Sequence, residues 1–379
     1  MKGKWVVFAV LVAFVVPAMI SRSRAVNTQQ IDTILTKQQL SSQDLQIIDD
    51  FLKEAVQELV RTRDFTSVAK IRTVIVSKKS TQAQYARQFS ESALKYISLG
   101  FEQAKQLPDD RQFKVTLNLL ILTDSLVDTR LVDLAIGKLR DENEVIRYWA
   151  VRCVTNLGLI QQLNLAGPAN AQLARRITEQ LRGLIDNSNP EILGLIAEFA
   201  ARINLPEGQD LLGRIADMRT KKYADWTVEY ELLDGAILKL LCSKMLTTGS
   251  NRPVPIIGKA TPPIARRFGQ LYSHVMQRYM RAQDFLSDTQ KHHLASVLVE
   301  TEDKCIRWLL EMPQTTIRKT VERGDYSALQ REHNRLFGNE TSPGALAVKL
   351  KFDYGTDAAG KKRAAPLPLP EPPMTKPPG

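Results

Sequence analysis

The chain has 379 residues, of which 44% are hydrophobic and 25% are charged, a composition typical of a folded protein with a sizeable core. Its formal net charge is +11, and its length suits one extended repeat domain or two compact domains. The three cysteines, Cys153, Cys242 and Cys305, are odd in number and widely spaced, which excludes a disulfide framework and a cysteine metal site. We expect Cys153 and Cys242 to be buried, unreactive thiols.

Residues 1–25 have the pattern of a secretory signal peptide. A positive start precedes the apolar run of residues 5–20, and the small residues Ser23 and Ala25 suit cleavage before Val26. An uncleaved membrane anchor is the alternative, although this run falls short of the roughly 20 residues that span a bilayer. We therefore expect an exported protein, periplasmic or secreted, or one that is tethered to the membrane through this segment.

Much of the positive charge lies outside the predicted folded body. Cleavage would remove four basic residues, and Lys361, Lys362 and Arg363 carry three more charges near the C-terminus. Because an exported protein rarely meets nucleic acid, we expect no nucleic-acid partner. The remaining excess suits an anionic surface or polymer of the cell envelope.

A 3.6-residue apolar period runs through most of residues 28–335, whereas strand-like alternation is almost absent, so the sequence predicts an all-α fold. Residues 26–127 form the predicted N-terminal helices. These helices are expected at residues 42–63, 67–77, 83–99 and 113–126, and a further one at 129–139 leads into the next region.

Residues 141–158 (DENEVIRYWAVRCVTNLG) combine an apolar helical stripe with small residues at Ala150 and Cys153. Small side chains let a neighbouring helix approach closely. Asp141 can cap the start of this helix, and Gly158 can end it in the left-handed conformation. The segment resembles the second helix of a HEAT repeat, and armadillo-like folds more generally. This resemblance implies an irregular α-solenoid (alpha-alpha superhelix) of helical hairpins.

Internal similarity supports repetition over residues 128–246. A glutamate followed by two apolar residues recurs at Glu144, Glu191 and Glu231, about 47 and then 40 residues apart, which is the spacing of HEAT and armadillo units. Each triplet follows a helix and a polar turn. Because the turns differ in length and composition, we expect irregular stacking.

The remaining regions are a loop, a helical cap and a tail. Residues 247–263 contain Gly, Asn and four prolines, and we expect an exposed binding or hinge loop there. Residues 264–337 are expected to form a C-terminal helical cap, with helices at 264–285, 288–311 and 315–337.

Residues 338–379 are predicted to be an extended, Pro-rich, disordered tail. Within them, residues 345–354 alternate apolar and charged side chains and are the one expected strand. The sequence LPLPEPPMTKPP either serves as a preorganised extended ligand for an aromatic groove or acts as a stiff spacer.

Motifs for catalysis, cofactors or metals are absent from the sequence. The four histidines are His274, His292, His293 and His333; the adjacent pair would point about 100° apart on a helix and cannot share a metal. We therefore expect no catalytic residue, no cofactor and no metal. Trp149, Trp226 and Trp308 are expected mainly in the core, although a partly exposed tryptophan on a concave face could hold a peptide or a sugar.

Basic doublets are the most frequent charged pattern. If repeats stack, they could align into a positive stripe on a concave face, although scattered solvated charges are the alternative. The doublets are Lys78-Lys79, Arg175-Arg176, Lys221-Lys222 and Arg266-Arg267.

These patterns favour an exported, non-enzymatic α-solenoid that acts as a protein-binding scaffold in the cell envelope, with one or more envelope proteins as partners. The alternative is a hydrolase or lyase with helical toroid geometry that acts on cell-wall polymer. That alternative needs acids and aromatics to converge, for instance Asp225, Trp226, Glu229 and Glu231, with Asp225 and Glu229 on one helix face.

Overall fold

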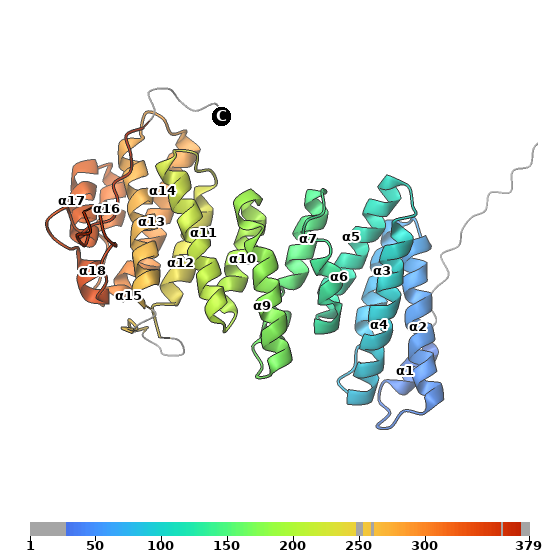
Figure 1. The fold of residues 1–379 in the computed structure, drawn as a ribbon. Coiled ribbons are helices and arrows are strands. Elements are labelled where there is room, and N and C mark those ends of the chain that lie inside the picture. The colour runs from blue at the N-terminus through green and yellow to red at the C-terminus, as the bar shows by residue number, and fades with distance from the viewer. Residues whose placement is uncertain (1–27, 248–252, 259–260, 358, 373–379) are drawn as a thin grey trace, which may run out of the picture. The chain divides into compact units, whose positions relative to one another are not determined.

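The structure is a computed structural model that describes residues 28–247, 253–258, 261–357 and 359–372. Its described residues contain helices and no named strand, which confirms the all-α class (Figure 1). The predicted signal peptide lies outside the described residues. No described helix is long and apolar enough to cross a bilayer. The chain divides into two compact units, residues 1–107 and 108–379.

The first unit is a small helical cluster. Its helices are α1 (Gln29–Ile34), α2 (Ser42–Arg61), α3 (Phe65–Ser77) and α4 (Ala83–Ala104). Helix α2 packs against both α3 and α4. It starts at a capping box, in which the Ser41 hydroxyl accepts from the Asp44 backbone N–H while the Asp44 carboxylate accepts from that of Ser41.

The second unit contains the remaining helices. They are α5 (Asp109–Leu126), η1 (Thr129–Leu131), α6 (Val132–Ile136), α7 (Glu144–Val154), α8 (Leu157–Leu163), α9 (Pro168–Arg182), η2 (Ile185–Asn187), α10 (Pro190–Arg202), α11 (Pro206–Ala224), α12 (Glu231–Ser243), α13 (Thr261–Arg281), α14 (Asp288–Thr301), η3 (Glu302–Ile306), α15 (Arg307–Leu309), α16 (Thr316–Arg323), α17 (Tyr326–Phe337) and α18 (Ala345–Leu350). The predicted helix at 288–311 is interrupted by η3, a π-helix. The one at 315–337 is divided at Gly324, which has a φ of +63°.

Helices of the second unit contact one another in two rows. In one row α7, α10, α12 and α14 are successive neighbours, and in the other α9, α11, α13 and α17 are. The rows contact each other through α10 and α11, α12 and α13, and α13 and α14. The three repeated glutamate triplets lie at or next to the starts of α7, α10 and α12. This arrangement is compatible with a helical repeat fold.

Helix α7 is the segment that resembles a HEAT helix, and its small residues Ala150 and Cys153 are buried as expected. Its ends differ from the prediction. Asn143 rather than Asp141 caps the helix, because its side-chain oxygen accepts from the N–H groups of the first turn. Gly158 does not end the helix but lies in α8, where a Cβ would be 2.7 Å from Cγ1 of Val127.

The predicted loop at 247–263 is shorter than expected, because α13 begins at Thr261. Pro262 and Pro263 occupy its first turn, where a missing N–H costs no helical hydrogen bond. Among the described loop residues, Thr247 N–H donates to the Val254 carbonyl at 2.9 Å.

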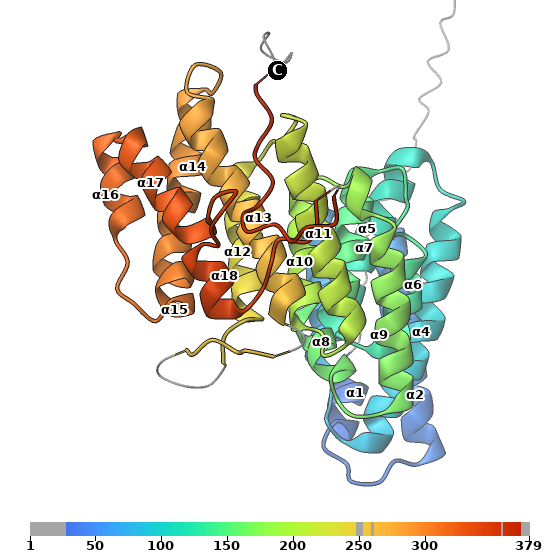
Figure 2. The same cartoon turned by 60° about the vertical axis from the view of Figure 1, so that its left-hand side comes forward.

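Two expectations for the C-terminal region are wrong. The predicted strand at 345–354 begins with helix α18, whose buried residues Leu346, Ala347 and Leu350 follow a helical period. The predicted disordered tail is ordered over residues 361–372. Lys361 and Arg363 bond to the backbone of residues 354–357, and the segment from Leu367 onward lies against α13 with no helix of its own (Figure 2). The last residues, 373–379, lie outside the described part.

All three cysteines are free and buried, which agrees with the expectation for Cys153 and Cys242. Burial raises the pKa of the Cys153 thiol, and its Sγ donates to the Leu120 carbonyl at 3.2 Å. A protonated, inaccessible thiol is a poor nucleophile.

Candidate functional site

One face of α13 carries four polar side chains at helical spacing: Gln270, His274, Gln277 and Arg281. Positions separated by four, three and four residues lie in line along a helix. We call this set the α13 stripe. Although polar, His274 and Gln277 are almost fully buried, with exposed fractions of 2% and 3%. Buried polar groups need hydrogen-bond partners, and the C-terminal chain supplies one for His274 Nε2 and one for Gln277 Oε1.

The tail segment, residues 366–371, lies along this stripe in extended form (Figure 2). Gln270 forms a two-way pair with Leu367: its Nε2 donates to the Leu367 carbonyl at 2.9 Å, and its Oε1 accepts from the Leu367 N–H at 2.9 Å. Further along, Gln277 Oε1 accepts from the Leu369 N–H at 2.8 Å. Arg281 Nη1 then donates to the Leu369 carbonyl at 2.9 Å. The stripe therefore recognises backbone groups.

The alternation of leucine and proline fits this recognition. Proline has no N–H, so between residues 366 and 370 the backbone donors are those of Leu367 and Leu369, and each meets a glutamine. Leu369 is 2% exposed and anchors the segment by burial, whereas Leu367 is 53% exposed. Leu367 contacts Gln270 and Leu369 contacts Gln277 and Arg281, so the tail segment and α13 run in the same direction. The segment thus has a defined direction and register.

Trp226 forms the far end of the site. Its Nε1 donates to the Pro370 carbonyl at 3.2 Å, and its ring lies 5.6 Å from the guanidinium carbon of Arg278. Trp226 belongs to the connection between α11 and α12, where both Trp226 and Tyr230 have φ of +57°. The left-handed backbone conformation is strained for residues other than glycine, and proteins retain such strain mostly at binding and catalytic sites.

A buried ion pair between α11 and α12 holds their connection in place. Arg219 of α11 and Asp234 of α12 form two bonds, Nε to Oδ1 at 2.6 Å and Nη2 to Oδ2 at 2.9 Å. Tyr223 Oη also donates to Asp234, and Arg219 Nη2 donates to the Glu229 carbonyl at 2.7 Å. Burial and the Asp234 charge raise the pKa of Tyr223 well above its usual value. These contacts position the connection that carries Trp226.

The four residues of the polymer-acting hypothesis do not form the expected cleft. Residues 225–230 are not helical, so Asp225 and Glu229 do not share a helix face, and both are exposed. Glu231 is 2% exposed, and its Oε1 lies 3.8 Å from Nη2 of Arg278. Of the four, Trp226 hydrogen-bonds to the tail segment.

Two histidines are buried without a metal arrangement. Burial lowers the pKa of His274 and lowers that of His333 to about 4. His333 Nε2 lies 2.8 Å from Ser273 Oγ, and His274 Nε2 lies 3.1 Å from the Leu367 carbonyl oxygen. Within the described ranges, no group of three or more His, Cys, Asp or Glu residues could hold a metal ion.

The basic doublets on α9 and α13 pair with carboxylates. The pairs are Arg175 with Glu207 at 3.1 Å, Arg176 with Asp133 at 2.5 Å, Arg266 with Asp353 at 2.9 Å and Arg267 with Asp217 at 3.0 Å. These acids offset the positive stripe that the sequence suggested. Trp149, Trp226 and Trp308 are all half-buried, and Trp226 is the one of the three that hydrogen-bonds to the tail segment.

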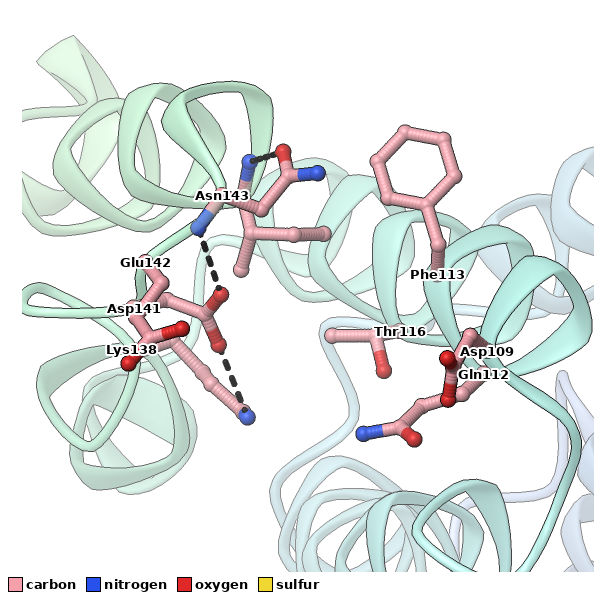
Figure 3. A pocket seen from close by; sticks show the side chains of 9 residues that line it. Asp109, Gln112, Phe113, Thr116, Lys138, Asp141, Glu142 and Asn143 are labelled. Atoms are coloured by element: carbon pink, nitrogen blue, oxygen red, sulfur yellow. Dashed lines mark hydrogen bonds and ion pairs between the residues drawn. The ribbon is translucent and has the colours of Figure 1, made fainter.

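A separate pocket of about 360 Å³ lies between α5 and the turn before α7 (Figure 3). Lys138 Nζ lies 3.1 Å from Asp141 Oδ2, and Asp141 Oδ1 accepts from the Asn143 N–H at 3.2 Å. Asn143 in turn caps α7. The polar groups on this side of the pocket therefore stabilise the turn.

Sequence reasoning named Trp226 and His274 and missed the α13 stripe as a site. The sequence does contain the pattern. The residues at positions 270, 274, 277 and 281 are all polar, and their helical spacing places them on one face, apart from the apolar residues of the same helix. Nothing in that pattern says that the line is covered by the chain's own tail.

No family model matches the chain, and no curated protein matches it. Among solved structures, the crystal structure of an engineered protein matches with 12% sequence identity and a TM-score of 0.22, over 86% of this chain and 95% of that chain. A likeness at that TM-score carries no argument about fold or function.

Proposed function

We propose that this protein is an exported, non-enzymatic α-solenoid of HEAT-like hairpins, which acts as a protein-binding scaffold in the cell envelope and binds an extended, proline-containing segment of a partner on the α13 stripe. The observation that carries the proposal is that Gln270 both donates to and accepts from the backbone of Leu367, while Gln277 accepts from the backbone N–H of Leu369. The two rows of helices and the small residues of α7 support the HEAT-like assignment.

Backbone recognition suits a scaffold. A glutamine side chain offers one acceptor and two donors, which match the N–H and C=O of an extended peptide. Proline-rich segments lose little conformational entropy on binding because they are already extended, and they dock on grooves with aromatic residues such as Trp226. In the structure the chain's own tail fills the stripe, so a partner segment must displace it.

The test uses the full chain with its tail released. Leu367→Pro and Leu369→Pro together remove both N–H donors without removing the stripe. A fluorescent peptide of residues 364–373 should bind this double variant, measured by anisotropy, and should bind the unmodified chain more weakly because the tail competes.

The matched control is the same peptide with N-methylated leucines, which lacks the two donors. It should not bind. Gln277→Ala in the double variant should weaken the unmethylated peptide about fivefold, the equivalent of about 1 kcal/mol. Equal binding of the methylated peptide would show that the α13 stripe does not recognise the backbone and would overturn the proposal.

A further inference from the structure

Next to the α13 stripe lies a second pocket, of about 300 Å³, at the lower end of the range for small-molecule sites. Its charged lining consists of three arginines, Arg266 and Arg267 of α13 and Arg363 of the C-terminal chain, and one acid, Asp217. We call it the arginine pocket. Asp353, the partner of Arg266, lies outside this lining and also pairs with Lys362 at 3.3 Å. With both included, four positive charges face two negative charges, an excess of two.

The existing partners leave many donors of these arginines unused. Arg266 uses Nε and Nη2 for Asp353, and Arg267 uses Nε for Asp217. Arg363 has no carboxylate within ion-pair distance among the described residues, and its Nε and Nη1 are buried without a hydrogen-bond partner there. A shielded guanidinium without a counter-charge is unfavourable.

The guanidinium groups lie against two glycines. Nη2 of Arg363 and Nη1 of Arg266 both lie within 3.6 Å of the position that a Cβ of residue 355 would take. The guanidinium of Arg267 lies against α11, where a Cβ on Gly213 would be 2.9 Å from its Cζ. Like charges that converge in this way repel one another unless an anion lies between them.

We propose that the arginine pocket binds a small dianionic oxyanion of the phosphate-ester class. Arginine suits this chemistry because its planar fork pairs with two oxygens at once. A dianion matches the lining charge better than a carboxylate does, since a single negative charge would leave half of the excess uncompensated. The arginine pocket is distinct from the α13 stripe, but Gln270 and Leu367 border both, so displacement of the tail segment by a partner would alter the lining of the pocket.

The experiment is a calorimetric titration of the full chain with phenyl phosphate at low salt, with benzoate as the monoanionic comparison. We expect saturable binding of phenyl phosphate and at least tenfold weaker binding of benzoate. Arg267→Gln should weaken phenyl phosphate about tenfold or more, as expected for the loss of a charged hydrogen bond. The matched control is Arg202→Gln, an exposed arginine that pairs with Glu198, and it should leave binding unchanged.

Gly213→Ala supplies a variant that alters no charge. Its methyl group would displace the Arg267 guanidinium, so affinity should fall while circular dichroism and the melting temperature of the fold stay close to those of the parent chain. No saturable binding to the parent chain would overturn the proposal. An equal loss in Arg202→Gln would also overturn it, because it would indicate general attraction to a positive surface.

Discussion

Gln277 accepts a hydrogen bond of 2.8 Å from the backbone N–H of Leu369, across 92 residues of sequence. Both groups are buried, so the bond forms only when the tail segment lies on α13. Its partner contact, Arg281 Nη1 to the Leu369 carbonyl, satisfies the other backbone group of the same residue. The C-terminal chain is therefore part of the second unit, in contrast to a solvated spacer.

Gln277→Ala should release the tail. The change leaves the Leu369 N–H without its partner, at a cost of about 1–3 kcal/mol. Trypsin should then cut after Lys361, Lys362 or Arg363 several times faster, measured by the mass of the released C-terminal peptide. Gln330→Ala, which removes only an exposed contact with Asn334, should leave the rate unchanged. Equal cleavage rates in the parent chain and in both variants would contradict the claim that the Gln277–Leu369 hydrogen bond holds the tail.

Asp234→Asn should strongly destabilise the second unit. It leaves Arg219 buried without a counter-charge, and loss of one partner of a buried pair costs about 3–5 kcal/mol. Asp186→Asn breaks an exposed pair with Arg214 and should cost less than about 1 kcal/mol. Urea unfolding of the two variants gives the comparison. Similar midpoints for both would disprove the role assigned to the buried pair.

Stability should fall at acidic pH through His333. Its pKa is about 4 in the folded chain and 6.5 when exposed. Between these values the unfolded state binds more protons, so the free energy of unfolding decreases as pH falls from about 6.5 to about 4. The loss is on the order of 3 kcal/mol.

The pH dependence can be isolated with His333→Gln. The midpoint of urea unfolding is measured for the parent chain and the variant near neutral pH and near pH 4. The parent chain should lose more stability than the variant over that interval. Parallel losses would assign the acid sensitivity to other groups.

Gly158→Ala should destabilise the fold by overpacking. A Cβ there would lie 2.7 Å from Cγ1 of Val127, which is too close for a carbon–carbon contact, and relief of such clashes costs about 1–3 kcal/mol. Gly137→Ala is the control, because the nearest atoms to its Cβ would be backbone oxygens at 3.6 and 3.7 Å. Thermal melts should separate the two variants, and equal melting temperatures would refute the close approach.

The proposed export predicts the residue at which the mature chain begins. If residues 1–25 are a cleaved signal peptide, the intact mass of the protein from its native envelope fraction begins at Val26. A mass that begins at Met1 would support the tether instead. A full-length chain in the soluble cytoplasmic fraction would contradict both forms of the export proposal.

The helices could be predicted from the sequence because their apolar period is long and regular. The predicted helix at 42–63 is α2 at Ser42–Arg61, and the small residues of α7 are buried as the pattern required. Short segments were harder. Residues 345–350 are too few to distinguish alternation from a helical period, and Val348, which alternation places inside, is 63% exposed.

The candidate site could not be predicted, because it joins residues that lie between 88 and 144 positions apart in the sequence. Proline content predicts an extended backbone for the tail segment but not the surface that it contacts. Likewise, Asp225 and Glu229 are four residues apart in sequence, yet the chain between them leaves the helix, and spacing alone does not reveal where a helix ends.

Hydrogen–deuterium exchange of the tail segment tests the central claim most directly. Because residues 366, 368 and 370 are prolines, the exchangeable backbone hydrogens from 366 to 370 are those of Leu367 and Leu369. Both should exchange slowly in the parent chain, and the Leu369 hydrogen should lose its protection in Gln277→Ala. Exchange of both at the rate of a free peptide in the parent chain would contradict the account, because the α13 stripe would then be uncovered.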